Sequence, residues 1–83
     1  MKYVLLFFLF YLASANAKDS YCYSIKAYDK KNYCLAKANS RASYCYSIRE
    51  TDLKNYCLAQ VLNRKSFCYS IKNRDSRNDC LAL

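Results

Sequence analysis

Six cysteines are the residues of this chain whose type and spacing are best suited to chemistry. Such a set can ligate a metal, supply a thiolate nucleophile or form disulfides. Metal ligation is disfavoured because the sequence has no histidine and no Cys-x-x-Cys pair. An even number of cysteines in a short exported chain is typical of disulfides, so we expect three disulfides, no metal and no cofactor. The cysteines are Cys22, Cys34, Cys45, Cys57, Cys68 and Cys80.

The spacing of these cysteines favours one pairing over the others. Cys22 and Cys34 lie 12 positions apart, and the same spacing recurs in the two later pairs. Pairing across neighbouring pairs, such as Cys34 with Cys45, leaves the first and last cysteines to meet from opposite ends of the chain. Pairing within each 12-residue spacing needs no such closure. We therefore expect the within-unit pairing, with the cross-unit pairing as the alternative.

Catalytic chemistry has little support in the remaining residues. Acyl transfer by serine or cysteine needs a general base, and the usual base, histidine, is absent. Glycine is also absent, which excludes the common phosphate-cradling loops. Asp29, Asp52 and Asp75 could act as acids or bases, but a helix-capping role at a helix start explains them without catalysis. We expect a protein that is not an enzyme.

The cysteine pairs belong to a repeat that recurs every 23 residues, from Ser20, Ser43 and Ser66. Each serine precedes an aromatic-Cys-Tyr run and is predicted to cap a first helix. The recurring aspartate nine positions later, with an asparagine three positions beyond it, resembles a capping box and predicts a second helix. The turn between the two helices is expected near residues 27–29. Each unit is therefore predicted to be a helical hairpin.

The composition of the chain supports a helical scaffold. Neither glycine nor proline occurs, whereas helices can be ended and restarted by Ser, Asp and Asn. We predict an all-α fold of three tandem 23-residue, disulfide-stapled helical hairpins, stacked as a small solenoid-like array. The repeats span about 20–42, 43–65 and 66–83. Large aliphatic residues are few, so tyrosines are expected to complete the core.

The first 17 residues have the layout of a signal peptide: Lys2, an apolar run from Val4 to Ala13, and small residues at Ala15 and Ala17. The apolar run is shorter than the roughly 20 residues that a membrane-spanning helix needs. We therefore predict cleavage after Ala17, a single small domain at 18–83, and a secreted or periplasmic location.

The chain is strongly basic, with a formal net charge of +8. Basic residues recur after the repeated isoleucine and again two positions after the repeated aspartate, and a tyrosine follows the first cysteine of each unit. In a stacked array such positions form stripes, which could bind an anionic partner or only keep the surface solvated. Likewise, the tyrosines could bind a ligand or cover the core. The candidate stripe contains Lys26, Arg49, Lys72, Lys31, Lys54, Arg77, Tyr23, Tyr46 and Tyr69.

These features favour an exported, non-enzymatic binding module for an acidic protein, such as an envelope enzyme that it inhibits or protects against, or for another anionic envelope surface. The alternative is a cationic membrane-active or antimicrobial peptide, which the charge and tyrosines favour but the lack of a long amphipathic helix opposes. A structural envelope protein is a further alternative. Nucleic acid is not an expected partner outside the cytoplasm.

Overall fold

The computed structural model describes residues 20–83, and the described chain is helical with no strand, as the sequence predicts. The predicted signal peptide and its cleavage point lie outside the described residues. Within residues 20–83, no helix combines the length and the apolar character needed to cross a membrane.

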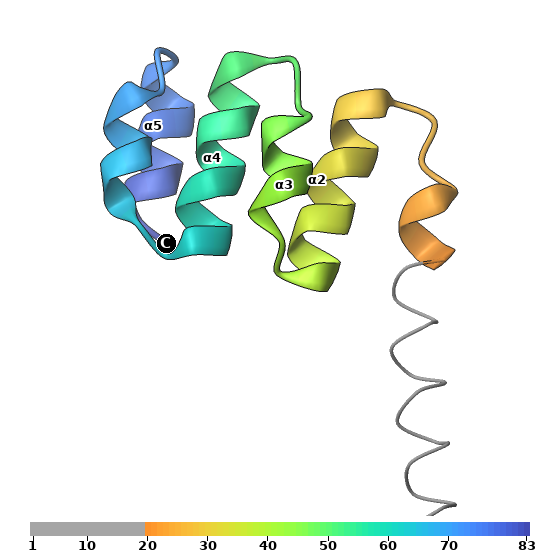
Figure 1. The fold of residues 1–83 in the computed structure, drawn as a ribbon. Helices are drawn as coiled ribbons and strands as arrows, with labels where there is room; N and C mark the ends of the chain where they lie inside the picture. Colours follow the sequence, from red (N-terminus) through yellow and green to blue (C-terminus); the bar gives the residue numbers. More distant parts are fainter. Residues whose placement is uncertain (1–19) are drawn as a thin grey trace, which may run out of the picture.

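Each repeat unit contains a short helix, a turn and a longer helix, and the units lie side by side in chain order (Figure 1). In the first unit, residues 20–23 are helical and α2 spans Tyr28–Asn39. The second unit contains α3 (Ala42–Tyr46) and α4 (Thr51–Leu62). The third contains η1 (Lys65–Ser70), a 3-10 helix, and α5 (Arg74–Leu81). The predicted helical hairpin is therefore present in every unit, with its first turn at residues 24–27 instead of 27–29.

Ser43 and Ser66 do not cap the short helices of the second and third units. The extended residue that precedes α3 is Arg41, with φ −121°, and Ser43 already lies inside the helix. η1 likewise begins at Lys65, one residue before Ser66. No side chain caps either start. The prediction of serine N-caps is therefore wrong for Ser43 and Ser66, because the backbone enters the helix before it reaches the serine.

Two of the longer helices are capped by the side chain two positions before the repeated aspartate. Glu50 accepts hydrogen bonds from two amides of the first turn of α4, and Asn73 accepts one from Ser76 N at 2.9 Å. Ala27, at the same position before α2, has no side chain able to cap. The capping residue thus varies among the units, and the aspartates occupy the second position of each helix.

Two non-glycine residues in the left-handed region end the helices α2 and α4. Ser40 has φ 52° and Asn63 has φ 54°, and their backbone amides bond back to Ala36 O and Ala59 O. Asparagine tolerates this conformation better than most residues, and the αL residue satisfies carbonyls that the helix end leaves free. This geometry explains how the chain reverses direction without glycine.

Three disulfides join the two helices of each unit: Cys22 to Cys34, Cys45 to Cys57, and Cys68 to Cys80. The Cα atoms of each pair lie 5.5 Å apart, within the range that a disulfide requires. The within-unit pairing predicted from the spacing is confirmed. Disulfides of this kind are typical of an oxidising compartment.

The disulfides of the second and third units lie in the core. α4 contacts both helices before it and both helices after it, and two clusters of buried residues lie along these contacts. One cluster contains Ala36, Cys45, Ile48, Cys57 and Leu58. The other contains Ala59, Cys68, Ile71 and Cys80. Half-buried aromatic side chains, Tyr33, Tyr44, Tyr56 and Phe67, pack around the clusters and complete them.

Candidate functional site

The repeated aspartate has a structural role that differs from the predicted cap. The carboxylate of Asp29 accepts hydrogen bonds from the backbone amides of Arg49 at 2.9 Å and Glu50 at 3.1 Å. Asp52 accepts the same pair of bonds from Lys72 at 2.9 Å and Asn73 at 3.1 Å. Each aspartate therefore holds the turn of the following unit. We call this contact the inter-unit clamp.

Electrostatics at the second clamp favour the ionised carboxylate. The pKa of Asp52 lies below its usual value, chiefly because the amides of Lys72 and Asn73 donate to the carboxylate and also because the Lys72 ammonium is near. The aspartate is thus not poised to exchange a proton near neutral pH.

Most other repeated positions also have a packing role. Ile48 and Ile71 are buried, as are Leu35 and Leu58. Asn32 is buried and donates its side-chain amide to Tyr28 O within the same helix, so it is not a helix cap as predicted. These residues recur because each unit packs against its neighbours in the same way.

The repeated tyrosine that follows the first cysteine of each unit, and the serine after it, have no packing role. Tyr23, Tyr46 and Tyr69 are 62%, 62% and 71% exposed, and each is followed by an exposed serine. No ring contact involves these tyrosines in the described part of the chain, where the one ring pair joins Tyr33 and Tyr56. The expectation that tyrosines cover the core therefore holds for Tyr33, Tyr44 and Tyr56 and fails for the Tyr-Ser positions.

The basic residue two positions after each of these serines is also exposed. Lys26, Arg49 and Lys72 lie in the turns, and the guanidinium carbon of Arg49 lies 4.3 Å from the ring centre of Tyr28. The backbone amides of Arg49 and Lys72 donate to the clamps, and all three basic side chains are exposed. We call the set of recurring exposed residues the Tyr-Ser-basic surface. It contains Tyr23, Ser24, Lys26, Tyr46, Ser47, Arg49, Tyr69, Ser70 and Lys72.

The second predicted row of basic residues differs from the first. Lys31, Lys54 and Arg77 are half-buried along the longer helices. Arg77 donates from its guanidinium to Ile71 O at 3.2 Å, which ties it to its own unit. The structure therefore separates the two rows, and only the row in the turns is fully exposed.

Exposed positions that drift between units make the recurring ones informative. The residue after the basic position is Ala27, Glu50 or Asn73, and all three are exposed. The residue type at an exposed position can therefore differ between the units. Ser24, Ser47 and Ser70 were missed as candidate site residues, although their identity in all three units was visible in the sequence. Ser47 Oγ donates to Ser43 O at 3.4 Å, which is a weak contact.

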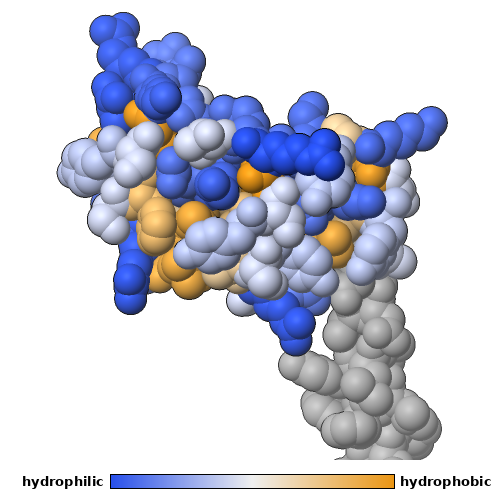
Figure 2. All heavy atoms as spheres, turned by 45° about the horizontal axis from the view of Figure 1, so that its top comes forward, coloured by the Kyte–Doolittle hydropathy of each residue, from blue (hydrophilic) through white to orange (hydrophobic). Residues whose placement is uncertain are grey.

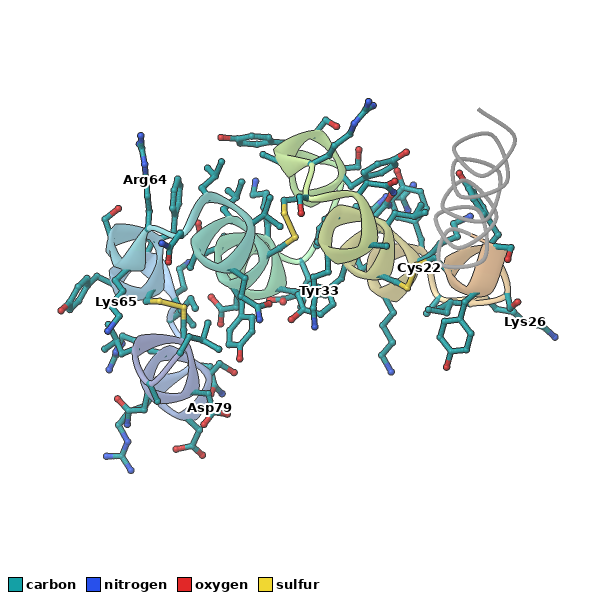
Figure 3. All side chains as sticks on the ribbon, turned by 90° about the horizontal axis from the view of Figure 1, so that it is seen from below. Cys22, Lys26, Tyr33, Arg64, Lys65 and Asp79 are labelled. Carbon is teal, nitrogen blue, oxygen red and sulfur yellow. A yellow bond between two sulfur atoms is a disulfide. The ribbon has the colours of Figure 1, made fainter. Side chains whose placement is uncertain are left out.

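An open groove of about 300 Å³ crosses the second and third units and also includes Tyr33. Its carboxylates are largely engaged, since Glu50 caps α4 and Asp52 forms a clamp. Tyr33 donates to Gln60, and burial together with the nearby Tyr56 raises the pKa of Tyr33. Tyr33 and Asp79 extend on the same side of the array (Figure 3).

Within residues 20–83 no group of three acidic, cysteine or histidine side chains is placed to hold a metal.

The surface seen from the side of the turns is polar at its edges. Hydrophilic side chains project along both edges of this face, and apolar residues gather between them (Figure 2). Lys26 extends at one end of the array, and Arg64 and Lys65 extend from the other (Figure 3). Positive charge is therefore distributed over the length of the molecule.

Comparison with protein-family models, with curated proteins and with solved structures finds no match to this chain.

Proposed function

We propose that the chain is exported, loses its first 17 residues, and acts as a solenoid-like, non-enzymatic binding module for an acidic protein partner. One observation carries this proposal. Exposed Tyr, Ser and Lys or Arg recur in all three units, at positions where packing does not require these residue types. An envelope enzyme that the module inhibits or neutralises is the kind of partner that this surface fits.

The chemistry of the surface suits an acidic protein. Tyrosine offers a large contact area with few rotatable bonds and a hydroxyl that bonds to polar groups. Lysine and arginine next to it pair with carboxylates and increase the rate of encounter. The disulfides hold these groups in place before binding, which lowers the entropic cost of association. Three equivalent sites on one molecule also add avidity when the partner presents more than one acidic segment.

A matched pair of variants tests the proposal. Lys26, Arg49 and Lys72 are replaced together by Gln. The control replaces by Gln the residues Lys30, Lys65 and Arg74, which are exposed but have no basic residue at the same position of the other described units. Both variants lose the same charge. We expect the first to lose at least tenfold in retention of an envelope protein from cell extract at 0.15 M salt, where exposed charges are screened beyond about 8 Å, and the control to lose much less. Equal losses would indicate that only net charge matters.

A third variant separates the aromatic contribution. Replacing Tyr23, Tyr46 and Tyr69 by Ser leaves charge unchanged and removes no described core contact. We expect retention of the protein partner to fall as strongly as in the basic variant. Retention that is insensitive to these tyrosines would contradict a role for the Tyr-Ser-basic surface.

The second candidate is a cationic, membrane-active peptide, and the exposed tyrosines beside basic residues favour it as well, because both are suited to the polar boundary of an anionic bilayer. Anionic liposomes in the same salt series distinguish the two. If the protein binds liposomes, is released at a low salt concentration in the series and retains no protein from the extract, the membrane role is supported and the protein partner is contradicted.

A further inference from the structure

The junction between units is built twice in the same way. At both junctions an aspartate of one unit accepts hydrogen bonds from two successive turn amides of the next. Beside the clamp, Ile48 is buried in one cluster with Ala36 of the preceding unit, and Ile71 is buried in one cluster with Ala59 of the preceding unit. A unit therefore has two different faces, one for each neighbour.

Within residues 20–83, nothing covers the face of the first unit that corresponds to the face by which the later units contact the unit before them. Ile25 is half-exposed, whereas its equivalents in the later units are buried. Tyr21 is 74% exposed, whereas the equivalent Tyr44 and Phe67 pack against the core. The amides of Lys26 and Ala27, equivalent to those held by the clamps, have no hydrogen-bond partner within residues 20–83.

The third unit has the complementary face uncovered. Asp75 is equivalent to Asp29 and Asp52, and its exposed carboxylate accepts no hydrogen bond in the described chain. Ala82 is exposed, whereas Ala36 and Ala59 are buried at the same position of the earlier units. The two uncovered faces lie at opposite ends of the array, as the labels of Lys26 and Asp79 indicate (Figure 3).

We propose that a second copy of this chain docks head to tail on the first, with Asp75 of one copy accepting hydrogen bonds from the amides of Lys26 and Ala27 of the next. The contact repeats the junction already present within the chain. Ile25 of the second copy then lies against Ala82, as Ile48 and Ile71 share buried clusters with Ala36 and Ala59, and Lys26 lies beside Asp75 as Lys72 lies beside Asp52.

Head-to-tail contacts differ in symmetry from a two-fold dimer. Each copy uses a different face at each end, so association continues into a longer array unless the ends close on themselves. The junction is weaker than the internal ones for two reasons. Asp79 takes the place of the tyrosines that form the Tyr33–Tyr56 ring pair, and α5 has eight residues where α4 has 12. Association is therefore concentration-dependent.

Two single variants, one at each end, test this junction. Asp75→Ala removes the acceptor, and its carboxylate has no bond within the described chain. Ala27→Pro removes one donor without a change of charge, and the φ of −68° at Ala27 already suits proline. We expect the average mass of the oxidised wild-type protein to rise between about 10 μM and 1 mM in light scattering, a range in which even weak contacts become populated. Each variant should remain monomeric over the same range.

Mixing the two variants is the decisive step. Asp75→Ala retains an intact first-unit face and Ala27→Pro retains an intact third-unit face, so an equimolar mixture should form dimers and nothing larger. Circular dichroism of each variant should match that of the wild type. A wild-type protein that stays monomeric at about 1 mM, variants that associate like the wild type, or a mixture that does not dimerise would each overturn the proposal.

Discussion

The carboxylate of Asp52 and the backbone amide of Lys72 lie 2.9 Å apart across the boundary between the second and third units. This bond uses the main chain of the lysine and leaves its side chain in solvent. The same separation applies to Asp29 and Arg49. The hydrogen bonds between units thus use the backbone of the turn, and the basic side chains of that turn remain exposed.

The clamp should contribute to stability at one aspartate and not at its terminal equivalent. We expect Asp52→Ala to lower the melting temperature of the oxidised protein by several degrees, because two amides of the next turn lose their acceptor. Asp75→Ala is the matched control, since Asp75 has no partner in the described chain, and in dilute solution it should leave the melting temperature nearly unchanged. Thermal unfolding followed by circular dichroism measures both. Equal effects would contradict the clamp.

Acid should weaken the same contact. The pKa of Asp52 is lower in the folded protein than its ordinary value of 3.8, so the bond stabilises the fold fully above that value and is lost as the pH falls through the lowered folded pKa. We expect the stability difference between wild type and Asp52→Ala to stay constant from neutral pH down to about pH 4 and to disappear below it. Urea unfolding at a series of pH values measures this difference. A difference that persists at pH 2 would contradict the prediction.

The disulfide of the middle unit should matter more than that of the first. Replacing Cys45 and Cys57 together by Ser removes a cross-link worth about 3 kcal/mol in the chain-entropy model and loosens a unit that contacts neighbours on both sides. The same change at Cys22 and Cys34 affects only one junction. We expect the first double variant to unfold in a single step at much lower temperature. The second should retain the helices of the other two units, as protease mapping would reveal.

Loss of a repeated isoleucine should also cost more stability in the middle unit than in the first. Ile48→Ala removes a buried side chain and is expected to cost about 2–5 kcal/mol of unfolding free energy. Ile25→Ala removes a half-exposed side chain at the end of the array and should cost clearly less in dilute solution. Chemical denaturation of both variants provides the comparison. A similar cost at the two positions would indicate that Ile25 is covered in solution.

Several features of this protein followed from local residue patterns. The 23-residue repeat and the cysteine spacing predicted the helical hairpins and their disulfides, because a cross-link within a short segment depends on that segment alone. The absence of glycine and proline predicted helices, and Ser40 and Asn63 end two of them in the left-handed region. Predictions of single caps failed, because a shift of one residue in a helix start moves the role to the adjacent side chain.

The candidate site was predicted in part. The tyrosines and basic residues of the turns recur in the sequence, so their positions could be named. The sequence could not predict that Tyr23 is exposed whereas Tyr44 is half-buried. Both follow the same kind of pattern, and only packing against the neighbouring unit decides which ring is covered. For the same reason the half-buried row of Lys31, Lys54 and Arg77 could not be distinguished from the exposed row.

The sequence by itself therefore determined the helical class, the repeat and the cysteine pairing, since these depend on contacts between residues close along the chain. The tertiary structure decided what the repeated aspartates do and which repeated residues remain exposed. Those properties depend on contacts between residues about 20 positions apart, such as Asp29 with Arg49, and such contacts exist only once the units lie side by side.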